Sequence, residues 1–140
     1  MNKMLQAIGI ARKYYNKKTF YHALDVANYV SENYMIDKPT KEDAMIVAIL
    51  HDLLEDTDLK KEDLLKIFDE NIVNAVKILT KDKEQSYVDY CIEIKNSISL
   101  FSGQLAYWVK LADMKDHLSK TETLTDKLKA KYLEGLAYLL

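Results

Sequence analysis

The sequence predicts an all-α fold, a compact single-domain helical bundle over residues 1–140. Three observations support this prediction. The chain holds only three Gly and one Pro, so few residues interrupt a helix. Apolar residues recur at intervals of three and four, as on a buried helical face, rather than alternating as in a strand. A length of 140 residues is within the usual size of one domain and is long enough to bury a core.

The N-terminal half is expected to form three helices. The first two cover about residues 2–15 and 20–34, separated by the polar turn from Asn16 to Thr19. Asp37-Lys38-Pro39-Thr40 breaks the chain again, and Thr40 with Asp43 resembles a capping box that starts the third helix. The apolar run from Ala44 to Leu50 could also be a buried strand. The cap and the continuation through Leu54 favour a helix that is buried on all sides.

The C-terminal half is expected to add five helices that pack with the others as a bundle. They cover about residues 60–69, 71–80, 86–97, 103–118 and 124–139. The last of them ends in a segment rich in apolar residues, Tyr132 to Leu140. This segment could cover the bundle or form the contact of a homo-oligomer, and the sequence leaves both possibilities open.

Composition excludes several classes of partner. Lys and Arg number 20 and Asp and Glu number 22, which gives a net charge of −2 and no basic excess for binding a DNA or RNA polymer. The single Cys91 cannot form an intrachain disulfide, and neither a leader nor an apolar run of membrane-spanning length occurs. We therefore expect a cytoplasmic protein with no membrane partner, whose anionic ligands are small.

The segment from His51 to Thr57, His-Asp-Leu-Leu-Glu-Asp-Thr, places an imidazole and three carboxylates at the end of an apolar helix. His22 and Asp113 are flanked by apolar residues that would bury them. A buried Asp113 carboxylate needs a cation or hydrogen-bond donors, which Lys110 or a metal can supply. Two imidazoles and two carboxylates suit a divalent ion of the Mn, Fe or Zn type. The expected metal ligands are His22, His51, Asp52 and Asp113.

Glu55 and Asp56 follow one turn after the His-Asp pair and are the expected catalytic residues. If the third helix continues, His51 and Glu55 share one face while Asp52 and Asp56 share another. Carboxylates at the C-terminal end of a helix oppose its dipole, so a functional role is favoured over a merely solvated helix end. Both are placed to orient or deprotonate a water molecule at the metal site.

The order His22, His51-Asp52, Asp113 resembles the HD phosphohydrolase superfamily. The segment from His51 to Thr57 resembles the His-Asp-x-x-Glu-Asp-Thr box of RelA/SpoT-type alarmone hydrolases, and Leu79-Thr80-Lys81 and Val109 to Asp113 resemble two of their later elements. The resemblance covers roughly residues 19–118. It implies an HD-type helical fold and a Mn²⁺-dependent enzyme that removes pyrophosphate from the 3′ position of guanosine tetra- or pentaphosphate, a small phosphorylated nucleotide.

The resemblance also implies substrate-binding residues. Four lysines are expected to neutralise phosphate charge: Lys17, Lys18, Lys81 and Lys110. Those hydrolases usually carry Asn four residues after the last Asp, in contact with the nucleotide, whereas this chain has His117, which can still donate a hydrogen bond. The loop before His22 is also shorter here and lacks glycine. These departures leave two alternatives open, hydrolysis of an adenosine alarmone or nucleoside monophosphate, and a non-catalytic nucleotide- or partner-binding module.

Overall fold

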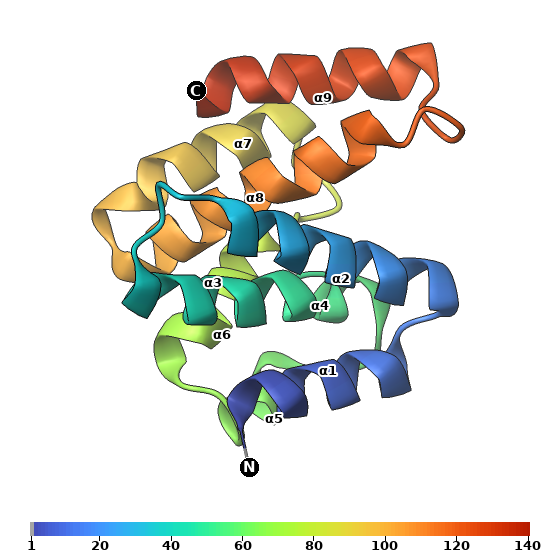
Figure 1. Ribbon diagram of the computed structural model, residues 1–140. Coiled ribbons are helices and arrows are strands. Elements are labelled where there is room, and N and C mark those ends of the chain that lie inside the picture. The colour runs from blue at the N-terminus through green and yellow to red at the C-terminus, as the bar shows by residue number, and fades with distance from the viewer. Residues whose placement is uncertain (1) are drawn as a thin grey trace.

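The computed structural model describes residues 2–140, and within that range it contains helices and no strand, which confirms the predicted all-α fold (Figure 1). In chain order the α-helices are α1 (Lys3–Tyr14), α2 (Lys17–Glu32), α3 (Lys38–Leu50), α4 (Leu53–Asp56), α5 (Lys61–Leu65), α6 (Glu70–Leu79), α7 (Tyr87–Asn96), α8 (Phe101–Ser119) and α9 (Asp126–Leu139). A 3-10 helix, η1 (Ser97–Ser99), connects α7 to α8.

Polar side chains cap the first turns of most helices, because the first N–H groups of a helix have no partner within it. Asn16 caps α2 by accepting a hydrogen bond from the N–H of Thr19 at 2.8 Å. The expected turn from Asn16 to Thr19 is therefore mostly the start of α2. Asp37 caps α3 by accepting from the N–H of Thr40 at 2.9 Å, so the predicted capping box of Thr40 and Asp43 was wrong. Pro39 occupies the first turn of α3, where its missing N–H costs nothing.

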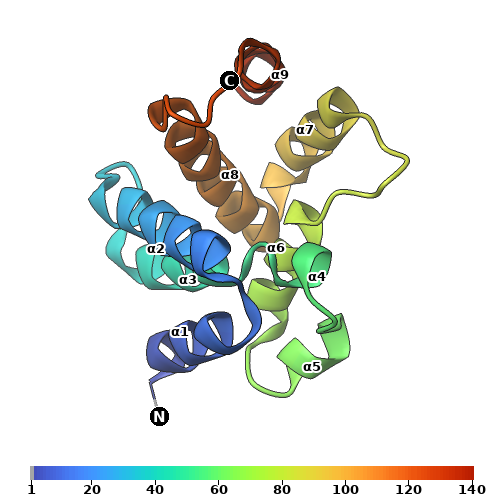
Figure 2. The same ribbon diagram turned by 90° about the vertical axis from the view of Figure 1, so that its right-hand side faces the viewer.

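The central helix is α8, which packs against α2, α3, α6, α7 and α9. Figure 2 shows α2 and α3 beside it on one side and α7 on the other. Leu105, Ala106 and Val109 of α8 are fully buried. Gly103 lets α8 approach η1, because a Cβ at this position would lie 1.8 Å from the carbonyl oxygen of Ser97. The core therefore lies along α8, and residues near its C-terminal end face the ends of α2 and α3.

The third helix ends at Leu50 instead of continuing through Leu54, which corrects the expected arrangement of the His-Asp box. The Tyr15 hydroxyl donates to the carbonyl of Ile49 at 3.0 Å and accepts from the N–H of Asp52 at 3.1 Å. The Nδ1 of His51 bonds to the carbonyl of Ala48, the group that the N–H of Asp52 would bond in a continued helix. Hydrogen bonds to side chains thus replace the backbone hydrogen bonds of a continued helix. The resulting turn directs His51 and Asp52 toward α8.

The other helices lie close to the expected ranges, with shifts at their ends. The helix expected over 60–69 is limited to 61–65, and the one expected over 103–118 covers 101–119. The last helix covers the bundle through its inner face, where Gly135 and Leu139 are buried, and it packs against α7 and α8. Across residues 2–140, no helix is both long enough and apolar enough to span a bilayer.

Candidate metal centre

Four ligand-type side chains from three parts of the chain meet at the C-terminal half of α8. His22 comes from the second turn of α2, His51 and Asp52 from the turn after α3, and Asp113 from α8. The Oδ1 atom of Asp113 lies 2.8 Å from the Nε2 of His22 and 3.3 Å from the Nε2 of His51. The Oδ2 atom of Asp52 lies 3.2 Å from the same Nε2 of His51. His51 and Asp113 are buried, and His22 lies at the margin of burial.

The hydrogen bonds of the two imidazoles leave their Nε2 atoms without protons in the neutral rings. The Nδ1 of His51 lies 2.5 Å from the carbonyl oxygen of Ala48, and the Nδ1 of His22 lies 2.6 Å from an Asp116 carboxylate oxygen. Both partners are acceptors, which favours a proton on each Nδ1 in the neutral ring. The Nε2 of His22 faces the Oδ1 of Asp113 at 2.8 Å, so a positive charge at that nitrogen is favoured too. With both rings neutral, two lone pairs on Nε2 atoms face carboxylate oxygens of Asp52 and Asp113. Lone pairs converging in this way need a cation between them.

The Nε2 of His51 is the observation that tests the fit to a metal. It is buried and has no hydrogen-bond partner of acceptable geometry among the described residues. A buried polar atom without a partner costs roughly 1–3 kcal/mol, and a divalent cation at this point would remove that cost. The ligand atoms of His22, His51 and Asp113 all lie within 4.8 Å of one another. The residues present therefore fit a divalent metal ion.

Lys110 is the fixed counter-charge of Asp113. Its ammonium donates to the Oδ2 of Asp113 at 2.9 Å, and both side chains are buried. Burial on its own raises the pKa of Asp113, but Lys110 and the nearby imidazoles hold that pKa well below its usual range. The ammonium also lies over the rings of Tyr87 and Tyr90, 5.2 and 4.9 Å from their centroids. Asp113 thus stays ionised, with Oδ2 occupied by Lys110 and Oδ1 turned to the imidazoles.

Asp116 is a site residue that the sequence analysis missed. Its Oδ2 contacts the Nδ1 of His22 at 2.6 Å and accepts from the Lys120 ammonium at 2.7 Å, and Lys120 also pairs with Asp25 at 3.0 Å. Partners of this kind fix which ring nitrogen of a ligand histidine is free to bind a metal. A signal was available in the sequence, because Asp113, Asp116 and Lys120 are spaced three and four apart and share one helix face.

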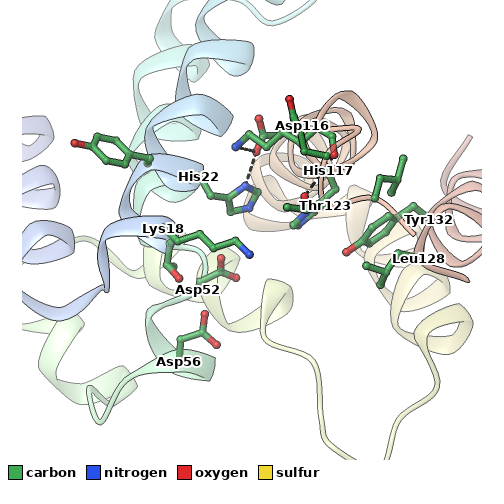
Figure 3. Close-up of a pocket in the computed structure, with 14 residues that line it drawn as sticks. Lys18, His22, Asp52, Asp56, Asp116, His117, Thr123, Leu128 and Tyr132 are labelled. Carbon is green, nitrogen blue, oxygen red and sulfur yellow. Dashed lines mark hydrogen bonds and ion pairs between the residues drawn. The ribbon is translucent and has the colours of Figure 1, made fainter. Parts of the chain in front are cut away.

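A cavity of about 580 Å³ opens beside the cluster (Figure 3). Lys18, His22, Asp52 and Asp56 lie on one side of it, while Leu128 and Tyr132 of α9 lie on the other, across from them. His117 lies between the two sides. This volume is in the range of small-molecule sites, and the wall that carries Lys18, Asp52 and Asp56 faces an apolar wall.

A second cavity of about 170 Å³ borders the same cluster. It shares Asp52, His117 and Tyr132 with the larger cavity. Its lining also includes three lysines, Lys81, Lys110 and Lys131. Lys131 was not predicted to be a site residue, because α9 reaches the cluster only by folding back across α7 and α8. The smaller cavity thus brings three lysines next to the carboxylates of the metal cluster.

Glu55 and Asp56 follow the His-Asp turn in α4 but occupy different places. The Oε1 of Glu55 accepts from the N–H of Lys81 at 2.6 Å, which ties α4 to the segment after α6, and Glu55 lines the smaller cavity. Asp56 faces the larger cavity together with Asp52. Partial burial raises the pKa of Glu55, and partial burial together with the charge of Asp52 raises the pKa of Asp56.

The four lysines expected to contact phosphate are not equivalent. Lys18 lines the larger cavity and points toward Asp52 in Figure 3. Lys81 and Lys110 line the smaller one, where Lys110 is already paired with Asp113. Lys17 is not among the described residues that line either cavity, and its ammonium lies 5.9 Å from the ring centroid of Tyr21. Lys18 and Lys81 are therefore better placed for a ligand than Lys17.

The model of the HD domain family matches residues 19–131, which is most of the chain and includes every member of the metal cluster. The chain belongs to the HD domain family. Membership of this family implies a divalent metal ion, and the cluster of His22, His51 and Asp113 provides the ligand atoms for one.

Two curated relatives of this HD protein carry the same name. It is 31% identical over 105 residues to guanosine-3′,5′-bis(diphosphate) 3′-pyrophosphohydrolase MESH1 of Drosophila melanogaster, a match that covers 74% of this chain and 56% of the fly protein. It is 32% identical over 84 residues to guanosine-3′,5′-bis(diphosphate) 3′-pyrophosphohydrolase of Borreliella burgdorferi. That match covers 59% of this chain and 13% of the bacterial protein. The HD chain thus spans about half of the fly relative and a small part of the bacterial one.

The fold of the HD protein is similar to a solved structure of a metazoan ortholog of SpoT, which is described as hydrolysing ppGpp and playing a role in starvation responses. The TM-score is 0.75 at 21% sequence identity, and the match covers 99% of this chain and 86% of the other. At this identity the likeness confirms the HD-type fold.

The raised pKa of His51 predicts that the stability of the chelator-treated protein depends on pH. Burial lowers the pKa of His51, but Asp52 and Asp113 outweigh it and raise the pKa to about 9. A raised pKa stabilises the fold below the unfolded value near 6.5, and this stabilisation is lost as the pH rises through about 9. We expect the free energy of unfolding in EDTA to fall by roughly 1–3 kcal/mol between pH 6.5 and 9.

Urea unfolding at a series of pH values measures this change. Mn²⁺ binds deprotonated imidazoles, so the stabilisation that it adds should grow over the same pH range. His51→Gln is the control, since the slope of stability against pH should shrink when this ring is absent. A stability in EDTA that stays constant from pH 6.5 to 9 would contradict the charge balance described for the cluster.

Proposed function

We propose that this protein is a metal-dependent phosphohydrolase that removes pyrophosphate from the 3′ position of guanosine tetra- or pentaphosphate. The observation that carries the proposal is the convergence of two imidazole Nε2 atoms and carboxylate oxygens beside a charged cavity, next to the acid pair of α4. The names of the two curated relatives support the choice of substrate. Residues 1–140 would act as one unit, since the family match extends from α2 into α9.

His22, His51, Asp52 and Asp113 would hold the cation, and we propose Mn²⁺ as that ion. A divalent cation supplies positive charge that polarises a phosphate oxygen and makes water a stronger acid. Two carboxylates among the ligands suit Mn²⁺, which prefers oxygen donors. Asp116 acts through His22, because it keeps the proton on Nδ1 and so keeps Nε2 available.

Asp56 would accept the proton of the attacking water. It faces the larger cavity next to Asp52, and its raised pKa makes it a stronger base than an ordinary aspartate. The water oxygen attacks the phosphorus bonded to the 3′ oxygen of the ribose. The bond between that phosphorus and the 3′ oxygen breaks, and the oxygen leaves as a 3′ hydroxyl, whose proton balances the one that Asp56 took from the water and then releases to solvent. Glu55 would orient the water and hold Lys81 at the edge of the smaller cavity.

Lysines of both cavities would neutralise the phosphates. Lys18 lines the larger cavity, and Lys81 and Lys131 line the smaller one. Lys120 also lines the larger cavity but is already paired with Asp25 and Asp116. Because Lys110 is already committed to Asp113, its role would be to keep that ligand ionised rather than to bind phosphate. The apolar wall formed by Leu128 and Tyr132 would take the base.

A nucleotide panel tests the proposed substrate. The protein is incubated with Mn²⁺ and guanosine or adenosine nucleotides that carry a 3′-pyrophosphate, alongside nucleoside monophosphates, and anion-exchange chromatography follows the products. Release of pyrophosphate from the guanosine compounds and none from the monophosphates is expected. Turnover of adenosine compounds alone, or of monophosphates alone, would contradict the proposed substrate and would still support the metal site. Tight nucleotide binding without turnover at any metal would instead indicate a binding module.

A further inference from the structure

Three imidazoles, and not two, converge on one oxygen of Asp113. Its Oδ1 lies 2.8 Å from the Nε2 of His22, 3.3 Å from that of His51 and 3.3 Å from that of His117. Ligand atoms bonded to one cation at about 2.0–2.2 Å, with angles near 90–110°, are separated by roughly 3–3.5 Å. His117 is therefore spaced from Asp113 as His51 is, at the distance expected of a neighbouring ligand.

The ring of His117 is held in this orientation by aromatic neighbours. It stacks on Tyr132 of α9, with centroids 4.9 Å apart and an interplanar angle of 9°. Its centroid also lies 4.5 Å from that of His22. Figure 3 shows His117 between these two side chains, at the opening of the larger cavity. Because His117 follows Asp113 by four residues, α8 places both side chains on the same face.

We propose that His117 is an additional ligand of the divalent cation, so that three imidazoles surround the ion. The inference rests on the proposed metal-dependent function, and it gives His117 a role different from the nucleotide contact expected from the sequence.

The contacts of Asp113 favour ligation over a simple hydrogen bond. Its Oδ2 is occupied by Lys110, and its Oδ1 already faces the Nε2 atoms of His22 and His51. A cation beside Oδ1 would join the Nε2 lone pairs of all three imidazoles to this oxygen, whereas a hydrogen bond would involve His117 alone. As a ligand, the Nε2 of His117 needs only its own lone pair directed at a cation beside Oδ1.

A third imidazole changes which ions the site prefers. Imidazole nitrogen suits Zn²⁺, Fe²⁺ and Ni²⁺, and Co²⁺ lies between the last two in the order of affinities, whereas carboxylate and water suit Mn²⁺. His117 should therefore raise the affinity for Co²⁺ more than the affinity for Mn²⁺. Replacing His117 by Asn separates the two roles of this residue, because an amide can still donate a hydrogen bond to a nucleotide but is a poor ligand for Co²⁺.

The test measures binding of Co²⁺ and Mn²⁺ by titration calorimetry to the wild-type protein, His117→Asn and His117→Ala. Thr123→Ala serves as the matched control, because Thr123 lines the same cavity and its hydroxyl bonds only to the carbonyl of Lys120 among the described residues. We expect both His117 variants to lose about tenfold or more in Co²⁺ affinity and less in Mn²⁺ affinity, while the control is unchanged. Circular dichroism confirms that each variant is folded.

Proton NMR of the Co²⁺-loaded protein reads the ligands directly. Ring protons of a ligating imidazole are shifted far outside the normal range, so the wild type should show signals from three imidazoles and His117→Asn from two. Equal Co²⁺ affinities and the same two imidazole sets in both proteins would overturn the assignment of His117 and leave the metal site standing. A wild-type protein that binds neither Co²⁺ nor Mn²⁺ would overturn both this inference and the proposed function.

Discussion

Replacing Asp113 by Asn should abolish divalent-cation binding and turnover and should lower the free energy of unfolding by about 3–5 kcal/mol. Asp113 is the only side chain among the described residues that pairs with all three imidazoles, those of His22, His51 and His117. It is also the ionic partner of the buried Lys110. A neutral amide leaves that ammonium without a counter-charge in the core and presents the metal with a weak ligand. Urea unfolding and titration calorimetry with Mn²⁺ measure the two effects.

A double variant separates the two effects of this substitution. Adding Lys110→Met to Asp113→Asn removes the unpaired charge, so much of the lost stability should return while cation binding stays absent. Full Mn²⁺ affinity in a folded Asp113→Asn protein would show that the cation binds elsewhere, and the site described above would then be wrong.

Replacing Asp56 by Asn should reduce kcat by roughly 10²–10⁴-fold, the usual contribution of a general base. The amide keeps the size of the side chain but cannot accept the proton of the attacking water. Asp56 makes no direct contact with the imidazoles among the ion pairs of the described residues, so affinity for Mn²⁺ and the melting temperature should change little. Steady-state kinetics with the guanosine substrate, together with calorimetry, measure these quantities.

The control for Asp56 is the neighbouring exposed carboxylate. Asp58 lies two residues later and carries the same charge, and it is not among the residues that line either cavity at the cluster. Asp58→Asn should therefore keep the wild-type kcat. If Asp56→Asn retained full activity while Glu55→Gln lost it, the role of base would pass to Glu55.

The members of the metal cluster could be found from the sequence because each lies in a recognisable local pattern. His51-Asp52 lies in a seven-residue box. Asp113 ends a short apolar segment, and its carboxylate needs a positive partner when it is buried. Helical periodicity likewise predicted the elements of the bundle to within a few residues at most of their ends. These patterns involve residues that are close in the sequence, so a single sequence is enough to recognise them.

Features that depend on distant residues could not be found in this way. The end of α3 at Leu50 depends on the hydroxyl of Tyr15, 37 residues before Asp52. The stacking of Tyr132 on His117 depends on how α9 folds back across α8. His117 itself was identified, but its approach to the Oδ1 of Asp113 required the side-chain positions of three helices. Local sequence patterns thus identified the ligand residues, while long-range packing determined which side chains contact one another at the site.

The most direct test of the account is the product analysis of one reaction, guanosine 3′,5′-bis(diphosphate) with the purified protein and Mn²⁺. We expect one equivalent each of pyrophosphate and guanosine 5′-diphosphate, with no product in EDTA and none from a folded Asp52→Asn variant. Pyrophosphate release that persists in EDTA or in Asp52→Asn would contradict a metal-dependent reaction at this cluster. Intact substrate with wild-type protein that has bound Mn²⁺ would contradict the proposed hydrolase activity.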